Sequence, residues 1–241
     1  MKKKNVLIIG ASGGLGIHIA SFFNQKGYHL ALHYNNNVGS LDKSFQENER
    51  VHFFQADIQS EDAISKMMGG VISKMGKIDI LINAAGVSKS AVSWKTPLDD
   101  WNETIAINLT GPFLCIKHVI PFMRENNYGR IINISSVVAQ SGFPGTVAYS
   151  ASKAGLIGMV KTIAKEVAST NVTVNNIALG YFNKGMINQI PENLQEDIKE
   201  TIPKKEFGKI NELTNCLAYL SSENSEYLTG QTINLNGGMY G

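Results

Sequence analysis

Cysteine and net charge are both scarce in this chain of 241 residues, and each scarcity argues against a class of protein. The two cysteines, Cys115 and Cys216, lie in apolar helical patterns without C-x-x-C spacing, which argues against a disulfide framework or a thiolate metal site. The five histidines are scattered, with no ligand partner at helical spacing, so we predict no metal. The formal net charge of +2 is too small to indicate nucleic acid or an anionic membrane as a partner.

Long apolar runs are also missing. The first apolar stretch, 6–9, ends at once at Gly10 and is shorter than the roughly 7–15 apolar residues of a signal peptide. We find no segment with the roughly 18–20 apolar residues of a membrane span. The sequence therefore predicts a cytoplasmic protein without a membrane partner.

Short apolar runs alternate with longer segments of helical periodicity, and this alternation indicates the fold class. The expected strands are 5–9, 29–34, 51–56, 78–82, 130–134, 172–177 and 232–235. The expected helices are 15–26, 61–75, 149–169 and 210–221, with helical material over 98–124 that Pro112 should break. Such alternation is typical of a parallel sheet with helices on both faces. We predict one α/β domain over 1–241, a Rossmann-type doubly wound parallel sheet of about seven strands.

The segment 180–207 interrupts this alternation. It contains Pro191 and Pro203 and few strong periodic signals beyond a short helix at 194–200. Because a connection this long in a compact domain is usually functional, we predict that it forms a lid. The alternative is a surface connection with no such role.

A glycine-rich loop joins the first strand to the first helix. Its sequence is Gly10-Ala11-Ser12-Gly13-Gly14-Leu15-Gly16. Glycines let the backbone approach a pyrophosphate, and the helix N-terminus offers free N–H groups. The loop lacks Gly-Lys-Ser/Thr, so a P-loop nucleotidase is not indicated. We predict that Gly10, Ser12, Gly13, Gly14, Leu15 and Gly16 contact a dinucleotide; a glycine-rich turn without a ligand is the alternative.

The residues at the end of the second expected strand indicate which dinucleotide the chain binds. NAD-binding proteins usually place an acidic residue there to bind the ribose 2′-hydroxyl. Here the residues are His33-Tyr34-Asn35-Asn36-Asn37, without an acid. Side-chain amides donate hydrogen bonds to a 2′-phosphate, which an acid would repel. The segment therefore favours NADP(H), with Asn35 and Asn36 as contacts.

Tyr149 and Lys153 form a candidate acid–base pair. They stand four residues apart in a helical segment, so both lie on one face. An ammonium beside a phenol stabilises the phenolate and lowers its pKa from about 10. Ser136 ends the fifth strand, at the sheet edge where open α/β folds bind ligands. Taken alone, Tyr-x-x-x-Lys is equally a pair on a helix surface.

Together these motifs resemble those of the short-chain dehydrogenase/reductase family, along essentially the whole chain. Ser136 precedes Tyr149 by thirteen residues, as in the family. The other matching motifs are the glycine loop, Asp57 after the third strand, Asn83-Ala84-Ala85-Gly86 after the fourth, Asn108 in Ile107-Asn108-Leu109-Thr110-Gly111, and Tyr149-Ser150-Ala151-Ser152-Lys153.

The resemblance implies a role for each matching residue. Tyr149 would protonate a carbonyl oxygen as hydride arrives. Lys153 would hold the nicotinamide ribose and lower the pKa of Tyr149, and Ser136 would hydrogen-bond the substrate oxygen. Asn108 would anchor a water that links Lys153 to solvent. The remaining cofactor contacts would be Asp57 and Ile58 at the adenine, Asn83, Ala84 and Gly86 along the cofactor, and Gly180 and Phe182 at the nicotinamide edge.

The segments 129–136 and 229–240 look most like those of 3-oxoacyl-[acyl-carrier-protein] reductases. This resemblance implies NADPH-dependent reduction of a 3-oxoacyl thioester, bound to acyl carrier protein or coenzyme A, in fatty acid or polyketide biosynthesis. It also implies a homotetramer. Two alternatives stay open: a reductase or dehydrogenase of another small ketone or alcohol, and a catalytically silent cofactor-binding subunit.

The chain departs from the family pattern at several positions. Ile9 replaces a threonine, Gly13 stands where many NADPH-preferring members have a basic residue, Leu179 replaces a proline and Lys184 replaces a threonine. Asn127 and Thr170 occupy positions where arginine serves carrier docking. We therefore expect weaker docking or a different basic patch, drawn from Arg124, Arg130, Lys161 and Lys165.

Overall fold

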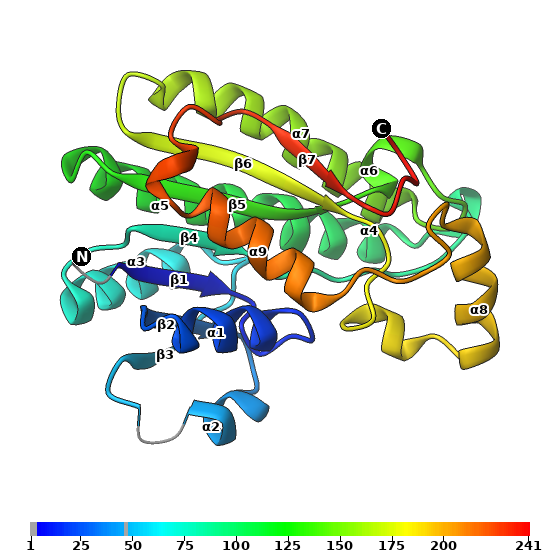
Figure 1. Cartoon of the computed structure of the whole chain (residues 1–241), viewed down its shortest axis with the longest axis horizontal. Helices are drawn as coiled ribbons and strands as arrows, with labels where there is room; N and C mark the ends of the chain where they lie inside the picture. The colour runs from blue at the N-terminus through cyan, green and yellow to red at the C-terminus, as the bar shows by residue number, and fades with distance from the viewer. Residues whose placement is uncertain (1–3, 46–47) are drawn as a thin grey trace.

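The computed structural model describes residues 4–45 and 48–241. Within them, seven strands form one fully parallel sheet in the order β3-β2-β1-β4-β5-β6-β7 (Figure 1). Strands β2 and β3 lie on one side of β1, and β4 to β7 lie on its other side. The direction in which successive strands are added to the sheet therefore reverses between β1 and β4. The strands are β1 (Asn5–Ile9), β2 (His29–Tyr34), β3 (Val51–Gln55), β4 (Ile80–Asn83), β5 (Gly129–Ser136), β6 (Val172–Leu179) and β7 (Thr232–Leu235).

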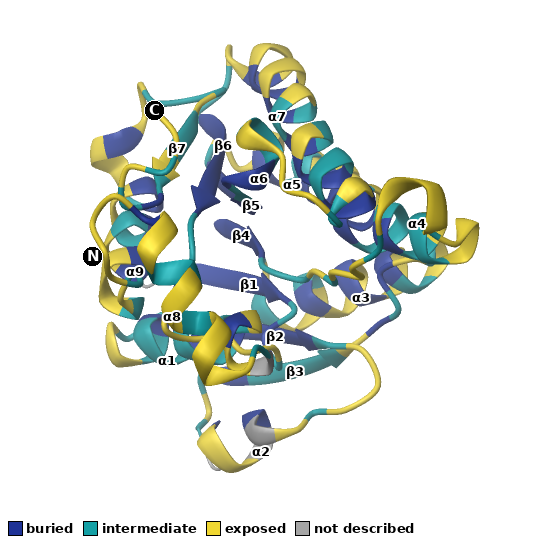
Figure 2. Ribbon diagram, turned by 90° about the vertical axis from the view of Figure 1, so that its right-hand side faces the viewer, coloured by how far each residue is buried: buried dark blue, intermediate teal, exposed yellow. Residues whose placement is uncertain are grey.

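Helices cover both faces of the sheet, which confirms the predicted doubly wound fold (Figure 2). One face packs against α3 (Glu61–Met75), α5 (Gly111–Glu125) and α7 (Val147–Val167). The other face packs against α1 (Gly16–Gln25), α2 (Ser40–Phe45) and α9 (Ile210–Leu220). The remaining α-helices are α4 (Leu98–Ile105), α6 (Val138–Ser141) and α8 (Glu192–Thr201), and short 3-10 turns occupy Ser93–Lys95, Met186–Gln189 and Glu223–Ser225.

Strand β1 shows why the core has two halves. Its residues Val6, Leu7, Ile8 and Ile9 are all fully buried, because a parallel strand covered on both faces needs apolar side chains in both directions. Leu7 and Ile9 join the α3–α5–α7 cluster, while Val6 and Ile8 join the α1–α9 cluster. Each such side chain contributes about 1.5–3 kcal/mol of burial free energy.

The expected elements are present, with ends displaced by at most two residues, but the predicted break at Pro112 is wrong. The helix runs on from α4 through a π-helical turn, Ala106–Thr110, into α5. Pro112 lies in the first turn of α5, directly after the wider turn. A proline ring clashes with the carbonyl four residues earlier in a regular α-helix, and the π turn accommodates it instead of a break.

This continuous helix bears on the expectation that the chain has no membrane span. Among the described residues, Leu98–Glu125 is the one helix long and apolar enough to pass for a membrane span, with a mean hydropathy of 1.4 over its 18-residue window. Its buried residues, however, pack against α3, α7, β4 and β5. It is a core helix whose other face is exposed.

The segment 180–207 contains the 3-10 turn Met186–Gln189 and α8, and α8 has no buried residue and is mostly exposed in Figure 2. Its base is tied to the chain that follows it by paired backbone contacts between Phe182 and Gly208. That this segment is a lid, and that 1–241 is one domain, stay predictions.

Candidate active site

The motif residues gather at the carboxyl ends of the strands, next to the reversal between β1 and β4. Gly10 follows β1, Asn83 ends β4, Ser136 ends β5 and Gly180 follows β6. Such a crevice is where open α/β sheets bind ligands. Strand topology therefore brings together residues that lie far apart in the sequence.

Two of the glycines are required by the packing of the loop itself. Gly10 has a φ of 78°, and a Cβ there would lie 2.6 Å from the Cα of Ala85. A Cβ on Gly16 would lie 2.1 Å from the carbonyl oxygen of Gly10. Neither position tolerates a side chain, so the loop folds tightly onto itself and onto the chain after β4.

The same loop presents free donors, and this fits a dinucleotide pyrophosphate. Within the described chain, the backbone N–H groups of Ser12, Gly14 and Leu15 donate to no acceptor. Helix α1 has no side-chain cap and no acidic residue in its first turn, so its positive end faces the loop uncompensated. Gly13 and Gly14 are exposed. Free N–H groups and a helix N-terminus are suited to bind phosphate oxygens.

The residues predicted at the adenine end lie after β2 and β3. Asn35 and Asn36 are exposed after β2, where donor groups are accessible. The Asp57 carboxylate accepts a hydrogen bond from the Gln59 N–H at 2.9 Å, which fixes the turn after β3. Ile58 is buried against Gly111. Their contacts with a cofactor stay predictions.

A row of buried amides crosses the sheet under the site, and the sequence reasoning did not anticipate it. Asn83 Nδ2 donates to Asn133 Oδ1 at 2.8 Å, and Asn133 Nδ2 donates to Asn176 Oδ1 at 3.1 Å. Asn176 Nδ2 donates to the Leu156 carbonyl, which can only accept, so the direction of the whole row is determined. Asn83 Oδ1 is left, among the described residues, as a buried acceptor without a donor.

Tyr149 and Lys153 lie one turn apart on α7 and are both buried, with the Lys153 Nζ 5.7 Å from the centroid of the Tyr149 ring. Lys153 Nζ donates to the carbonyl oxygen of Ile134 at 2.8 Å. The Ser136 side chain is close enough to the Tyr149 hydroxyl to act on its pKa. The structure thus brings the three predicted catalytic groups of β5 and α7 together.

Burial shifts the pKa values of this pair in opposite directions. It raises the pKa of Tyr149 to about 12, an effect that the Ser136 side chain opposes and the nearby Tyr181 reinforces. It lowers the pKa of Lys153 to about 8. The lowered pKa expected for Tyr149 is therefore not what this structure has, because desolvation outweighs the other effects and the lysine ammonium is directed at Ile134.

Asn108 lies in the π-helical turn, fully buried, with its side chain engaged in the protein. Its Oδ1 accepts from the Val87 N–H at 2.9 Å, and its Nδ2 donates to the Val87 carbonyl at 2.8 Å and to Ser152 Oγ at 3.2 Å. A Cβ on Gly86 would lie 3.4 Å from Asn108 Oδ1 and 3.5 Å from Lys153 Nζ. The side chain therefore holds the loop after β4 against α7, and a water would have to be anchored through the Asn108 backbone.

The residues predicted at the nicotinamide edge, Gly180 and Phe182, are held in position by backbone hydrogen bonds and close packing. Gly180 donates its N–H to the Leu235 carbonyl, and a Cβ there would lie 2.8 Å from the Cα of Asn236. The Phe182 ring is buried in the core beside Gly208. A cofactor contact at Phe182 would therefore use its main chain. Ala84, at the opposite side, donates its N–H to the Ile9 carbonyl and continues the β1–β4 pairing.

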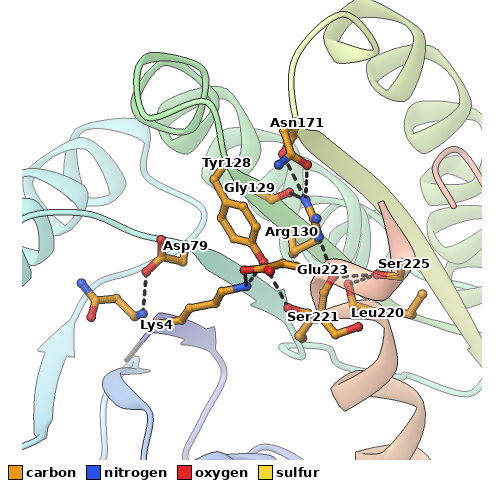
Figure 3. Close-up of polar contacts among 12 residues, drawn as sticks. Lys4, Asp79, Tyr128, Gly129, Arg130, Asn171, Leu220, Ser221, Glu223 and Ser225 are labelled. Carbon is orange, nitrogen blue, oxygen red and sulfur yellow. Dashed lines mark hydrogen bonds and ion pairs between the residues drawn. The ribbon is translucent and has the colours of Figure 1, made fainter. Parts of the chain in front are cut away.

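Arg130 does not belong to any surface basic patch, contrary to the sequence-based expectation. It is fully buried at the start of β5 (Figure 3). Its guanidinium donates to the carbonyls of Ser222, Gly129 and Asn171 and lies 4.4 Å from the centroid of the Tyr128 ring. The acceptors include the carbonyl of Ser222, just past the C-terminus of α9, where a cation is stabilised by the helix dipole. Lys184, in contrast, is exposed.

Comparison with known proteins identifies the class of enzyme. Residues 10–240 match a sequence family described as enoyl-(acyl carrier protein) reductase. The chain belongs to this family, which is part of the short-chain dehydrogenase/reductases, and it is therefore an oxidoreductase that uses a nicotinamide cofactor.

Three curated relatives narrow the comparison. The chain is 38% identical to the 3-oxoacyl-[acyl-carrier-protein] reductase FabG of Staphylococcus epidermidis, over 98% of this chain and 99% of the relative. It is 36% identical to the protein of that name from Staphylococcus aureus, over 98% of each. It is 38% identical to the one from Rickettsia felis, over 98% of this chain and 96% of the relative.

Proposed function

We propose that this protein reduces a 3-oxoacyl thioester to the 3-hydroxyacyl thioester with NADPH. The observation that carries the proposal is the assembly of Ser136, Tyr149 and Lys153 beside the glycine loop, at the carboxyl edge of the sheet. The names of the three relatives, which cover the chain almost completely, support the substrate class.

The proposed reduction depends on which side chains of the site carry a proton. A nicotinamide cofactor held at the glycine loop would supply the hydride that the carbonyl carbon accepts. Ser136 donates a hydrogen bond to the carbonyl oxygen, and Tyr149 gives that oxygen its proton. Because burial raises the pKa of Tyr149 to about 12, the phenol keeps its proton at neutral pH until the oxygen becomes basic. This state favours reduction, since oxidation of an alcohol would need a deprotonated tyrosine.

Lys153 returns a proton toward Tyr149 after transfer. Its pKa of about 8 leaves the ammonium mostly charged at neutral pH yet able to release a proton. Asn108 contributes by fixing the loop after β4 beside it. Of these four residues, Ser136 and Tyr149 touch the reacting oxygen, and Lys153 acts next to them.

We also propose that NADPH is preferred over NADH. After β2 the exposed Asn35 and Asn36 offer amide donors, and no acidic side chain stands among residues 33–37 to repel a 2′-phosphate. The free N–H groups of Ser12, Gly14 and Leu15 would hold the pyrophosphate.

The substrate assignment is tested by comparing two thioesters of equal length. Acetoacetyl-coenzyme A carries a 3-keto group, and crotonyl-coenzyme A carries only a carbon–carbon double bond, the kind of bond named in the family's description. We expect NADPH oxidation with the first and none with the second, and slower oxidation with NADH. Oxidation with crotonyl-coenzyme A alone, or with neither thioester in protein that binds NADPH, would reject the assignment.

The location and assembly belong to the same proposal. We infer a cytoplasmic homotetramer whose contacts use the exposed face of α5, where Phe113 is 44% exposed, together with α7 and the C-terminal tail. Light scattering of the purified protein measures the oligomeric state, and a monomer would reject this part.

A further inference from the structure

His33 is a buried, hydrogen-bonded histidine at the carboxyl end of β2, and the reaction scheme above does not use it. Its side chain is 2% exposed, although β2 ends beside the open crevice. A buried imidazole needs partners for both ring nitrogens, and its partners show what it does.

The two ring nitrogens join two other strand ends. The Gly10 N–H, at the start of the glycine loop, donates to His33 Nδ1 at 3.0 Å. His33 Nε2 lies 2.9 Å from the carbonyl oxygen of Ala56, the residue just after β3. The backbone adds to this link, because the Ala11 N–H donates to the His33 carbonyl at 2.9 Å. One side chain thus connects the ends of β1, β2 and β3, which lie side by side in Figure 1.

These partners determine the protonation state of the ring. The Gly10 N–H can only donate, so Nδ1 must carry a lone pair; the Ala56 carbonyl can only accept, so Nε2 must carry the proton. The ring is therefore neutral in this arrangement. A protonated ring would direct an N–H at the Gly10 N–H, and that hydrogen bond would be lost.

We propose that His33 is a positioning residue that sets the glycine loop against the adenine end of the dinucleotide site, and that it does so only as the neutral imidazole. Protonation of this ring releases Gly10 and weakens cofactor binding. The inference rests on the dinucleotide site of the proposed function and not on the identity of the substrate.

The electrostatic surroundings agree with the geometry. Burial lowers the pKa of His33 below its usual value, against the opposing effects of the Ala56 hydrogen bond and the Asp57 carboxylate. Among the described residues, Asp57, directly after Ala56, is the one titratable side chain whose charge acts appreciably on the ring. The other elements that the ring contacts, the start of the glycine loop and the end of β3, present backbone groups.

The consequence for pH dependence has a definite sign. The neutral form is favoured in the folded protein, so loop positioning is intact above the ordinary imidazole pKa of about 6.5. It is lost as the pH falls through the lowered pKa of His33. Because cofactor binding favours the neutral form, binding must in turn lower the pKa of His33.

Two substitutions separate the two hydrogen bonds. In His33→Asn the amide oxygen takes the place of Nδ1 and still accepts from Gly10, without titrating. In His33→Gln the amide takes the place of Nε2 and bonds Ala56 but leaves Gly10 without an acceptor. His52→Asn is a matched control, because His52 is a half-buried histidine in the middle of the edge strand β3.

The experiment is the Kd of NADPH, without substrate, from about pH 8 to about pH 5. We expect His33→Gln to bind about tenfold more weakly than His33→Asn at neutral pH, the factor for one lost buried hydrogen bond. We expect the wild-type Kd to rise relative to that of His33→Asn at acid pH, approaching about tenfold per pH unit below the imidazole pKa. The 2′-phosphate titrates equally in both proteins, so it cancels in this ratio.

Equal binding by the Asn and Gln variants, or the same pH profile for wild type and His33→Asn, would overturn the inference. If the variants do not fold, the imidazole pKa of wild-type His33 is measured by NMR with and without NADPH; a pKa unchanged by NADPH would also overturn it. A wild-type protein that binds neither NADPH nor NADH would instead reject the proposed function.

Discussion

At the scale of single residues, the site is built from polar groups that are buried before any ligand arrives. Tyr149, Lys153 and Asn108 are all nearly inaccessible, and the side chains of Lys153 and Asn108 are held by hydrogen bonds to the protein. Burial penalises the charged form of each ionisable group, which keeps the proton on Tyr149 and eases its release from Lys153. Both effects favour reduction at neutral pH.

The first prediction concerns this proton relay. Lys153 has a lowered pKa of about 8, so its ammonium is present below that pH and lost above it. We expect kcat for reduction, at saturating substrate and NADPH, to fall as the pH rises through about 8, to about a tenth one pH unit higher. A profile that stays flat well above pH 8 would show that Lys153 does not supply the proton.

The second prediction concerns the unpaired oxygen of Asn83. Ile9 is its direct partner across β1 and β4, so a hydroxyl at position 9 would lie on the same face, next to Asn83 Oδ1. Thr and Val have the same shape, and a buried Thr hydroxyl without a partner costs about 1–3 kcal/mol. We expect Ile9→Thr to be at least as stable as Ile9→Val in urea unfolding, because the hydroxyl donates to Asn83. A threonine variant clearly less stable than the valine variant would contradict this.

At the scale of elements, strand and helix positions follow from periodicity, whereas the features that make the site do not. The apolar runs of β1 and β5 were sufficient to place Gly10 and Ser136 at the ends of strands, and the helical spacing of α7 put Tyr149 and Lys153 on one helix face; that these groups form one site was implied by the family resemblance. The π turn before Pro112 was missed because a local proline rule does not include the packing that holds α4 and α5 in one helix. The asparagine row and the His33 contacts depend on the register between strands, which the periodicity of each single strand does not reveal.

The third prediction tests the loop–helix junction. A Cβ on Gly16 would lie 2.1 Å from the Gly10 carbonyl oxygen, so Gly16→Ala must displace the loop. We expect lower NADPH affinity and a lower urea midpoint. Gly69→Ala, on α3 with no atom within 4 Å of the added Cβ, is the control and should stabilise the fold by about 0.5–1 kcal/mol. Full NADPH affinity in Gly16→Ala would contradict the assigned role of the loop.

At the scale of the whole molecule, the sheet separates two functions. The carboxyl ends of the strands carry the reactive groups, and the buried Arg130 network near the start of β5 is structural (Figure 3). Burial of this kind could not be predicted from the sequence, where Arg130 looks like any other basic residue. Of the four cations expected to form a carrier-docking patch, Arg124, Lys161 and Lys165 are exposed.

The fourth prediction separates carrier-bound from coenzyme-A-bound substrates. Rim charges change the rate of association with an acidic partner, and salt screens this effect. We expect the triple variant Arg124→Ala, Lys161→Ala, Lys165→Ala to lose kcat/KM several-fold for acetoacetyl-acyl carrier protein at low salt. The value for acetoacetyl-coenzyme A should not change in a variant that light scattering shows to keep the wild-type oligomeric state, because α5 and α7 are also the proposed subunit contacts. Equal values for both substrates, before and after substitution, would show that these cations do not receive a carrier.

The most direct test of the whole account is NADPH oxidation with acetoacetyl-coenzyme A by the wild type and by Tyr149→Phe. The variant loses one hydroxyl and keeps the ring, and Tyr227→Phe, at a fully exposed tyrosine, is its control. The account predicts that Tyr149→Phe loses at least about 99% of kcat, the lower limit for a positioned acid, while its Kd for NADPH stays within about twofold and Tyr227→Phe stays fully active. Wild-type turnover in Tyr149→Phe would contradict the account.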